Sequence, residues 1–226
     1  MTGRAVYHRV AAPGLAGLAG SLLVLFAAFA EAQGISVTVT DSNGMPVPEV
    51  AVFIDSPGTG SRAAPGTRAV MDQVNERFVP HVLVVQTGTA VDFPNSDIVA
   101  HHVYSFSHPN HFKLPMYKGN AHPPVSFEES GIVVLGCNIH DNMLAYIVVV
   151  DTPMFAMTDA DGTARFTMPV ESARVSIWSP RIRDPEERLT VELAEARLQQ
   201  PVAFRLEKSL RPPHRDGTEA LTWSEY

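Results

Sequence analysis

The chain has 226 residues, 45% of them hydrophobic and 18% charged, and a formal net charge of −7 at pH 7. This balance is typical of a folded protein rather than of a disordered chain. The negative charge argues against nucleic acid as a partner, because phosphate backbones attract basic surfaces. The single cysteine, Cys137, excludes an internal disulfide.

Residues 1–32 have the pattern of a secretory signal peptide. Arg4 and Arg9 give a positive start, an apolar stretch follows, and a small-x-small cleavage site ends at Ala32. The alternative is an uncleaved membrane anchor, but the apolar stretch is short and interrupted by glycines. We expect cleavage, export to the periplasm and no membrane span afterwards. Without Arg4, Arg9 and Glu31, 15 of 17 basic and 23 of 24 acidic residues remain, a net charge of −8.

The rest of the chain consists of short runs that alternate apolar and polar residues or are rich in β-branched residues. Gly, Pro, Asn and Asp separate these runs, which predicts an all-β fold. A segment at 184–199 carries Glu and Arg at helical intervals and is a candidate for a short helix. We expect strands at 35–40, 49–54, 68–72, 82–86, 90–93, 102–106, 125–128, 132–135, 145–150, 164–168, 174–178, 189–193 and 202–206.

A group of sulfur and nitrogen donors follows the strand expected at 132–135. Cys137, His140 and Met143 are spaced three residues apart, so one tight loop can bring a thiolate, an imidazole and a thioether together. This donor set suits a copper electron-transfer site and is a poor one for zinc, calcium or magnesium. A lone cysteine in an oxidising compartment also needs its sulfur to be occupied. The alternatives are a buried free cysteine and a methionine that only packs in the core.

A second histidine has to come from elsewhere in the fold, and His101 is the candidate because it follows a strand that ends in a polar turn. His102 is the alternative. Successive strand residues face opposite sides, so only one of the two can point at a metal. His108, His111 and His122 form a candidate second metal site, although loop histidines are more often solvated or hydrogen-bonded.

Two longer segments around these residues carry a pattern of apolar residues, glycine and proline. One segment runs from Gly131 through the Cys-x-x-His-x-x-Met loop to Val150 and comes second in the chain. The first segment, with His101 beyond it, is Phe78-x-Pro80-x-x-Leu83-x-Val85-x-x-Gly88-x-x-Val91-x-Phe93-x-Asn95. Together they resemble the two halves of a plastocyanin-like or amicyanin-like cupredoxin, and the loop has the short spacing found in amicyanins.

The resemblance implies a Greek-key β-sandwich over residues 68–151 that holds one type 1 (blue) copper ion. It implies His101, Cys137 and His140 as the strong metal ligands. It implies Met143 as the long axial ligand.

The flanking segments resemble a different module, a carboxypeptidase regulatory-like β-sandwich. The whole combination is similar to bacterial proteins labelled methylamine utilisation proteins. The flanking patterns are Val37-x-Val39-x-Asp41-x-x-Gly44-x-Pro46-x-Pro48-x-Val50-x-Val52 and Thr158-Asp159-x-Asp161-Gly162-x-x-x-Phe166.

The expected architecture is therefore all-β, with a Greek-key cupredoxin β-sandwich inserted in a second small Ig-like β-sandwich. The joints are expected where Pro, Gly, Ser and Thr gather at 57–67, and at 151–153. The predicted parts are a signal peptide at 1–32, a flanking sandwich at 33–60 plus 152–208, a cupredoxin domain at 68–151, and a flexible tail at 209–226.

The predicted function is an exported carrier of single electrons between redox partners such as a c-type cytochrome or a dehydrogenase. His140 is the expected exit for the electron, bordered by the apolar Ile139 and Leu144. The alternative is a copper-binding or delivery module without a redox partner, but the eight methionines are scattered rather than clustered. An enzyme is not expected, because the residues beside Cys137 are not the histidines that link a type 1 copper to a catalytic one.

Overall fold

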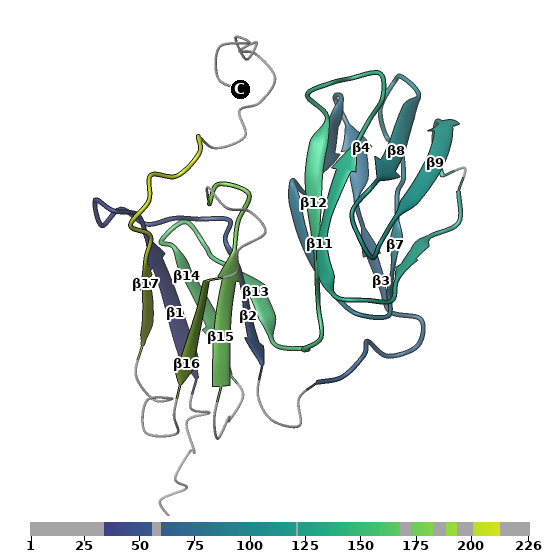
Figure 1. Cartoon of the computed structure of the whole chain (residues 1–226). Helices are drawn as coiled ribbons and strands as arrows, with labels where there is room; N and C mark the ends of the chain where they lie inside the picture. Colours follow the sequence, from purple (N-terminus) through teal and green to yellow (C-terminus); the bar gives the residue numbers. More distant parts are fainter. Residues whose placement is uncertain are drawn as a thin grey trace, which may run out of the picture. The chain divides into compact units, whose positions relative to one another are not determined.

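The computed structural model of this protein describes residues 34–55, 60–120, 122–167, 173–182, 189–193 and 201–212. They belong to one unit, Ala32–Tyr226. Every regular element within the described ranges is a β-strand, which confirms the all-β prediction (Figure 1). No described segment is a helix able to cross a membrane. The predicted signal peptide at 1–32 lies outside the described residues, as does the tail beyond residue 212.

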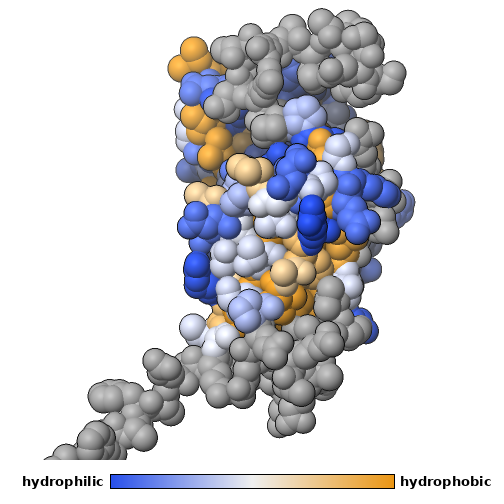
Figure 2. Space-filling view, turned by 90° about the vertical axis from the view of Figure 1, so that its left-hand side faces the viewer, coloured by the Kyte–Doolittle hydropathy of each residue, from blue (hydrophilic) through white to orange (hydrophobic). Residues whose placement is uncertain are grey.

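Two sheets enclose the first hydrophobic core. Alternation explains the sheet containing β1 (Ile35–Thr40): Ile35, Val37 and Val39 are buried, whereas the residues between them are partly exposed. Hydrophilic and hydrophobic residues are intermixed on the side of the molecule where β17 (Val202–Arg205) lies (Figure 2). In sheet order, the strands are β14 (Thr163–Phe166), β1 (Ile35–Thr40) and β17 (Val202–Arg205), and then β13 (Phe155–Met157), β2 (Ala51–Asp55), β15 (Ala173–Trp178) and β16 (Leu189–Leu193).

Two further sheets enclose a second core, to which Cys137 and Met143 belong. A two-stranded sheet of β4 (Asp72–Val74) and β5 (Arg77–Val79) adds Phe78 to this core. In sheet order, the strands are β6 (Val82–Gln86), β12 (Leu144–Val150), β11 (Gly131–Gly136), β8 (His101–Ser105) and β9 (Phe112–Tyr117), and then β10 (Val125–Phe127), β7 (Thr89–Asp92) and β3 (Arg68–Val70).

The register of β8, β11 and β12 determines where the predicted ligands meet. Antiparallel pairing places Gly136 opposite Leu144, so residues 137–143 form the loop between β11 and β12. Gly136 also lies opposite Tyr104 of β8, and β8 begins at His101. The start of β8 and the β11–β12 loop therefore lie at the same end of the sheet.

A third apolar cluster joins strands that border the first core to strands that border the second. Phe53 and Trp178 lie in it with Val82 and Val148, and the Trp178 ring is 5.3 Å from the Tyr146 ring between centroids. The outer face of β6 and β12 is therefore partly buried. The domain boundaries proposed from the sequence, 33–60 with 152–208 and 68–151, stay a prediction.

The strands differ from the expected ones at several places. The helix considered at 184–199 is wrong over residues 189–193, which pair with β15 as strand β16. β5, β9 and β13 were not expected. β5 and β13 have only three residues each, and β9 contains Pro115 in its middle. Proline is tolerated there because β9 is the edge strand of its sheet.

Candidate metal centre

The loop between β11 and β12 carries three of the four predicted ligands. The backbone N–H of Met143 donates to the carbonyl oxygen of His140 at 2.9 Å, and that of Leu144 donates to Asn142 at 3.1 Å. These turns fold the loop back on itself, and Nδ1 of His140 lies 3.9 Å from Sγ of Cys137. Spacing in the sequence and the turn together bring the imidazole to the sulfur.

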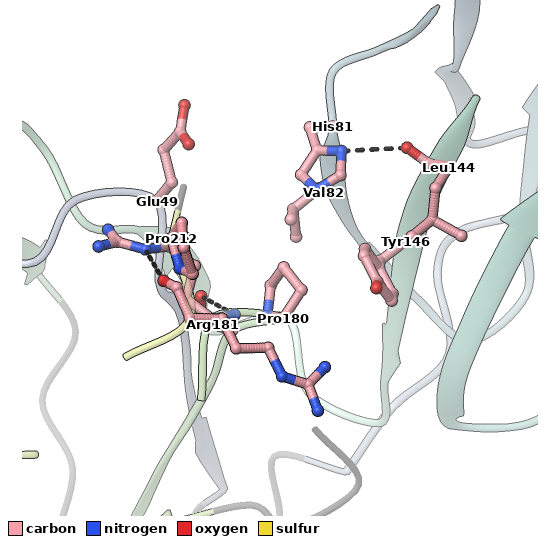
Figure 3. Close-up of a pocket in the computed structure, with 10 residues that line it drawn as sticks. Glu49, His81, Val82, Leu144, Tyr146, Pro180, Arg181 and Pro212 are labelled. Carbon is pink, nitrogen blue, oxygen red and sulfur yellow. Dashed lines mark hydrogen bonds between the residues drawn. The ribbon is translucent and has the colours of Figure 1, made fainter. Parts of the chain in front are cut away.

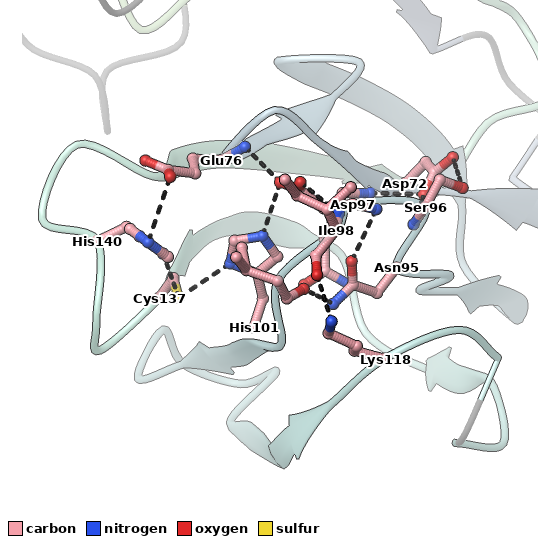
Figure 4. A network of polar contacts seen from close by, with 12 residues as sticks. Asp72, Glu76, Asn95, Ser96, Asp97, Ile98, His101, Lys118, Cys137 and His140 are labelled. Atoms are coloured by element: carbon pink, nitrogen blue, oxygen red, sulfur yellow. Dashed lines mark hydrogen bonds and ion pairs between the residues drawn. The ribbon is translucent and has the colours of Figure 1, made fainter.

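The second imidazole comes from the start of β8. His101 is fully buried, and its Nδ1 lies 4.0 Å from Sγ of Cys137 (Figure 4). His102 is partly exposed, with its ring 6.5 Å from the ring of Tyr104 between centroids. The structure therefore brings His101, and not His102, to Cys137, as the alternation of strand side chains requires.

The distances within this cluster fit a shared metal ion. The ligand atoms of His101, Cys137 and His140 all lie within 4.8 Å of one another, and no other such group occurs among the residues that the structure describes. In zinc sites, imidazole nitrogen lies about 2.1 Å and thiolate sulfur about 2.3 Å from the metal. A nitrogen and a sulfur that bind one ion at these distances and at trigonal angles would lie about 3.8 Å apart. The observed 3.9 and 4.0 Å match this value. Two imidazoles and a thiolate are donors that copper accepts.

Met143 is fully buried in the same core as Cys137. It lies on the same loop, at the end that joins β12. A thioether is a weak donor, so Met143 would hold a copper ion less strongly than the imidazoles and the thiolate. Its role as the fourth ligand stays a prediction.

Both imidazoles turn Nδ1 toward the sulfur and Nε2 toward a carboxylate. Nε2 of His101 lies 2.9 Å from Oδ2 of Asp97, and Nε2 of His140 lies 3.7 Å from Oε1 of Glu76. A carboxylate beside Nε2 favours the proton on that nitrogen, which leaves the lone pair on Nδ1 free. The surroundings thus prepare both Nδ1 atoms as ligands.

Asp97 is a buried anion held by several donors. Its side chain is 5% exposed, and the backbone N–H groups of Glu76 and Ile98 donate to it, each at 2.6 Å. The hydrogen bond from the Glu76 backbone, followed by that from His101, lowers the pKa of Asp97 to about 2. Asp97 therefore places a fixed negative charge behind His101.

Asn95 fixes the turn that carries Asp97. Its Nδ2 donates to the carbonyl oxygens of Val99 at 3.0 Å and Tyr117 at 2.8 Å, and its Oδ1 accepts from the backbone N–H of Asp97 at 3.0 Å. Asn95 is itself buried. This network, drawn in Figure 4, holds the carboxylate against His101.

We expect Asp97 to make the stability of the metal-free protein depend on pH. Its folded-state pKa of about 2 lies below the reference value of 3.8. The stabilising contribution of the Asp97 carboxylate is therefore complete above about pH 5 and is lost as the pH falls toward about 2. Urea unfolding of wild type and Asp97→Asn across this window should show a smaller loss of stability in the variant. Identical pH profiles would contradict this role of Asp97.

The described histidines between β8 and β11 do not join the cluster. The ring of His111 lies 5.4 Å from that of Phe106, and the ring of His122 lies 4.6 Å from that of Tyr117, between centroids. Within the described ranges, His108, His111 and His122 belong to no group of three ligating side chains. The structure does not support the second metal site considered from the sequence.

Two hollows of the described surface lie where β12 begins. Leu144 lines both of them, and its carbonyl oxygen lies 3.1 Å from Nδ1 of His81 (Figure 3). Neither hollow is lined by His101, Cys137 or His140. The cluster reaches the surface at His140 instead, whose side chain is 24% exposed. The hollow in Figure 3 is lined by Glu49, His81, Val82, Leu144, Tyr146, Ser179, Pro180, Arg181, Arg211 and Pro212.

No protein-family model and no curated protein sequence matches the chain. Among solved structures, a reduced Cu(I) form of an amicyanin mutant is 24% identical, with a TM-score of 0.34, over 44% of this chain and 98% of that chain. A purple cupredoxin from Nitrosopumilus maritimus is 21% identical, with a TM-score of 0.32, over 37% and 99%. A Cu-containing nitrite reductase from Thermus scotoductus is 22% identical, with a TM-score of 0.35, over 50% and 28%. Likeness at this level does not identify a function.

Two residues of the centre, Asp97 and Glu76, were not predicted from the sequence. Asp97 precedes His101 by four residues, but the spacing has no meaning without the turn that Asn95 holds. Glu76 lies 64 positions from His140 in the sequence and reaches it through the β4–β5 hairpin. No local pattern signals that contact.

Proposed function

We propose that this chain is a copper protein of the cupredoxin type that carries single electrons, with one type 1 site formed by His101, Cys137, His140 and Met143. The supporting observation is the convergence of two Nδ1 atoms on one buried sulfur, at 3.9 and 4.0 Å. A copper ion bound there supplies a one-electron couple.

Rigid placement of the donors suits this function. His101, Cys137 and Met143 are buried among the side chains of the second core. Closely packed interiors resist displacement of their side chains, and they exclude water from the sulfur. Donors that stay in place in both oxidation states keep the reorganisation energy of electron transfer small.

His140 provides the route between the sulfur and a partner. Its side chain is 24% exposed, and the adjacent Ile139 is 49% exposed. Leu144, the other apolar residue expected at this exit, is half-buried and lines the two hollows, and its place beside His140 stays a prediction. A partner can contact the imidazole edge through this apolar side chain.

The proposal extends to location and partner. The pattern at 1–32 supports export to the periplasm. The acidic surface supports a basic redox protein, such as a c-type cytochrome or a dehydrogenase, as donor or acceptor. We further propose that the flanking strands form a separate sandwich beside the copper domain.

Stopped-flow electron transfer with a basic cytochrome tests this function. We expect the rate to fall with rising salt, because ions screen attraction beyond about 10 Å at 0.1 M. Ile139→Lys should slow transfer about tenfold even at high salt, since it places a charge on the contact side chain. Met45→Lys adds the same charge at an exposed site in the other sandwich and serves as control. Equal rates for both variants would contradict docking at His140.

A further inference from the structure

The β4–β5 hairpin turns beside the cluster through Asn75 and Glu76. Val74 pairs with Arg77. Asn75 and Glu76 are therefore the two turn residues, and their φ angles are 51° and 59°. Two-residue turns with positive φ at both positions favour the sequence Asn-Gly. Asn75 fits the turn, whereas a glutamate at the second position is disfavoured by sterics. The turn itself therefore gives no reason for the side chain of Glu76.

Glu76 contacts the surroundings of both imidazoles (Figure 4). Its backbone N–H donates at 2.6 Å to the Asp97 oxygen that lies 2.9 Å from Nε2 of His101. Its carboxylate oxygen Oε1 lies 3.7 Å from Nε2 of His140. Any residue except proline, glycine included, supplies the backbone N–H. Only an acidic side chain brings a negative charge to the second contact.

The carboxylate of Glu76 remains accessible from solvent. Its side chain is 59% exposed while it lies at the exposed edge of His140. Asp141, which follows His140, is also exposed. A charge at this place acts on any molecule that approaches His140, because a group in contact with the imidazole edge comes well within a Debye length of the carboxylate.

We propose that Glu76 is a specificity-determining residue that makes electron exchange at His140 favour cationic partners over anionic ones. The inference rests on the proposed function. The partner that fits is a protein whose redox group is surrounded by lysine or arginine side chains. Because a nearby anion stabilises the more positive, oxidised state of the centre, Glu76 also lowers its reduction potential.

The test uses two small oxidants of opposite charge, the tris-phenanthroline cobalt(III) cation and the ferricyanide anion. Each accepts one electron from the reduced, copper-loaded protein, giving cobalt(II) or iron(II) and the oxidised protein. The measured quantity is the ratio of the two second-order rate constants, cation over anion. At low salt, Glu76→Gln should lower this ratio about tenfold, and the difference should shrink in high salt.

Glu129→Gln is the matched control, because it removes the same charge far from the cluster. Glu129 lies just before β11, and Cys137 lies just after it, at the other end of the strand. It should change the ratio less than about twofold, since six strand residues separate the two ends by about 20 Å. The reduction potential should rise in Glu76→Gln and stay unchanged in Glu129→Gln.

Glu76→Gly gives a readout that needs no copper. Because glycine suits a positive φ, the metal-free variant should unfold at a temperature roughly 2 °C higher than wild type while its rate ratio falls as in Glu76→Gln. Unchanged ratios in both variants, with wild type reacting with both oxidants, would overturn the role of Glu76 and leave the carrier function standing. A wild type that reacts with neither oxidant would overturn the carrier function itself.

Discussion

Cys137→Ser is expected to give a colourless protein that binds Cu(II) more than about a hundredfold more weakly than wild type. The serine hydroxyl has nearly the size of the thiol but stays protonated at neutral pH and is a harder donor, so it replaces neither the charge nor the softness of the thiolate. The visible band arises from charge transfer out of the thiolate and should vanish with it. Absorption spectra and competition with a chelator measure both effects.

The fold of this variant is checked by thermal unfolding of the metal-free protein. Cys137 is buried in the second core, and the near-equal volume of serine should keep the metal-free variant folded. A folded Cys137→Ser protein that keeps an intense visible band with copper would contradict the assignment of the sulfur ligand.

His101→Ala and His102→Ala should differ by more than about a hundredfold in copper affinity. Nδ1 of His101 lies 4.0 Å from the sulfur of Cys137, whereas His102 faces the opposite side of β8, beside Tyr104. His102→Ala should therefore keep the affinity and the spectrum within about twofold. Chelator competition measures the affinities, and the absorption spectrum reports the ligand set.

Added imidazole extends this comparison. His101 is fully buried, so its removal leaves a space next to the sulfur that a free imidazole can enter. Imidazole should restore part of the visible band to His101→Ala and leave that of His102→Ala unaltered. Loss of copper in His102→Ala together with retention in His101→Ala would show that the neighbouring histidine is the ligand.

Much of the fold follows from local patterns in the sequence. The strands expected at 35–40, 82–86 and 189–193 have the bounds that the structure shows. In β1, alternation alone marks the strand. Shorter strands escape this reasoning because three residues contain too little alternation, as in β5 and β13. Pro115 argues against a strand in the sequence, so β9 was not predicted. The structure accommodates this proline because β9 is an edge strand, whose outer side needs no hydrogen-bond partner.

The residues of the site likewise fall into those that local sequence patterns predicted and those that they did not. The spacing of Cys137, His140 and Met143 within one loop made them candidates without knowledge of the fold. His101 lies 36 positions from Cys137, and only strand alternation and the resemblance of the surrounding segment pointed to it. The sequence did not predict the two carboxylates, because Asp97 depends on the turn that Asn95 holds and Glu76 depends on how the β4–β5 hairpin packs.

The absorption spectrum of the wild-type protein with one equivalent of Cu(II) tests the central claim most directly. Two imidazoles and one thiolate around the ion predict an intense blue or purple charge-transfer band that saturates at one copper ion per chain and disappears on reduction. A copper-loaded, folded wild type that shows only the faint colour of nitrogen- and oxygen-bound Cu(II) would contradict it.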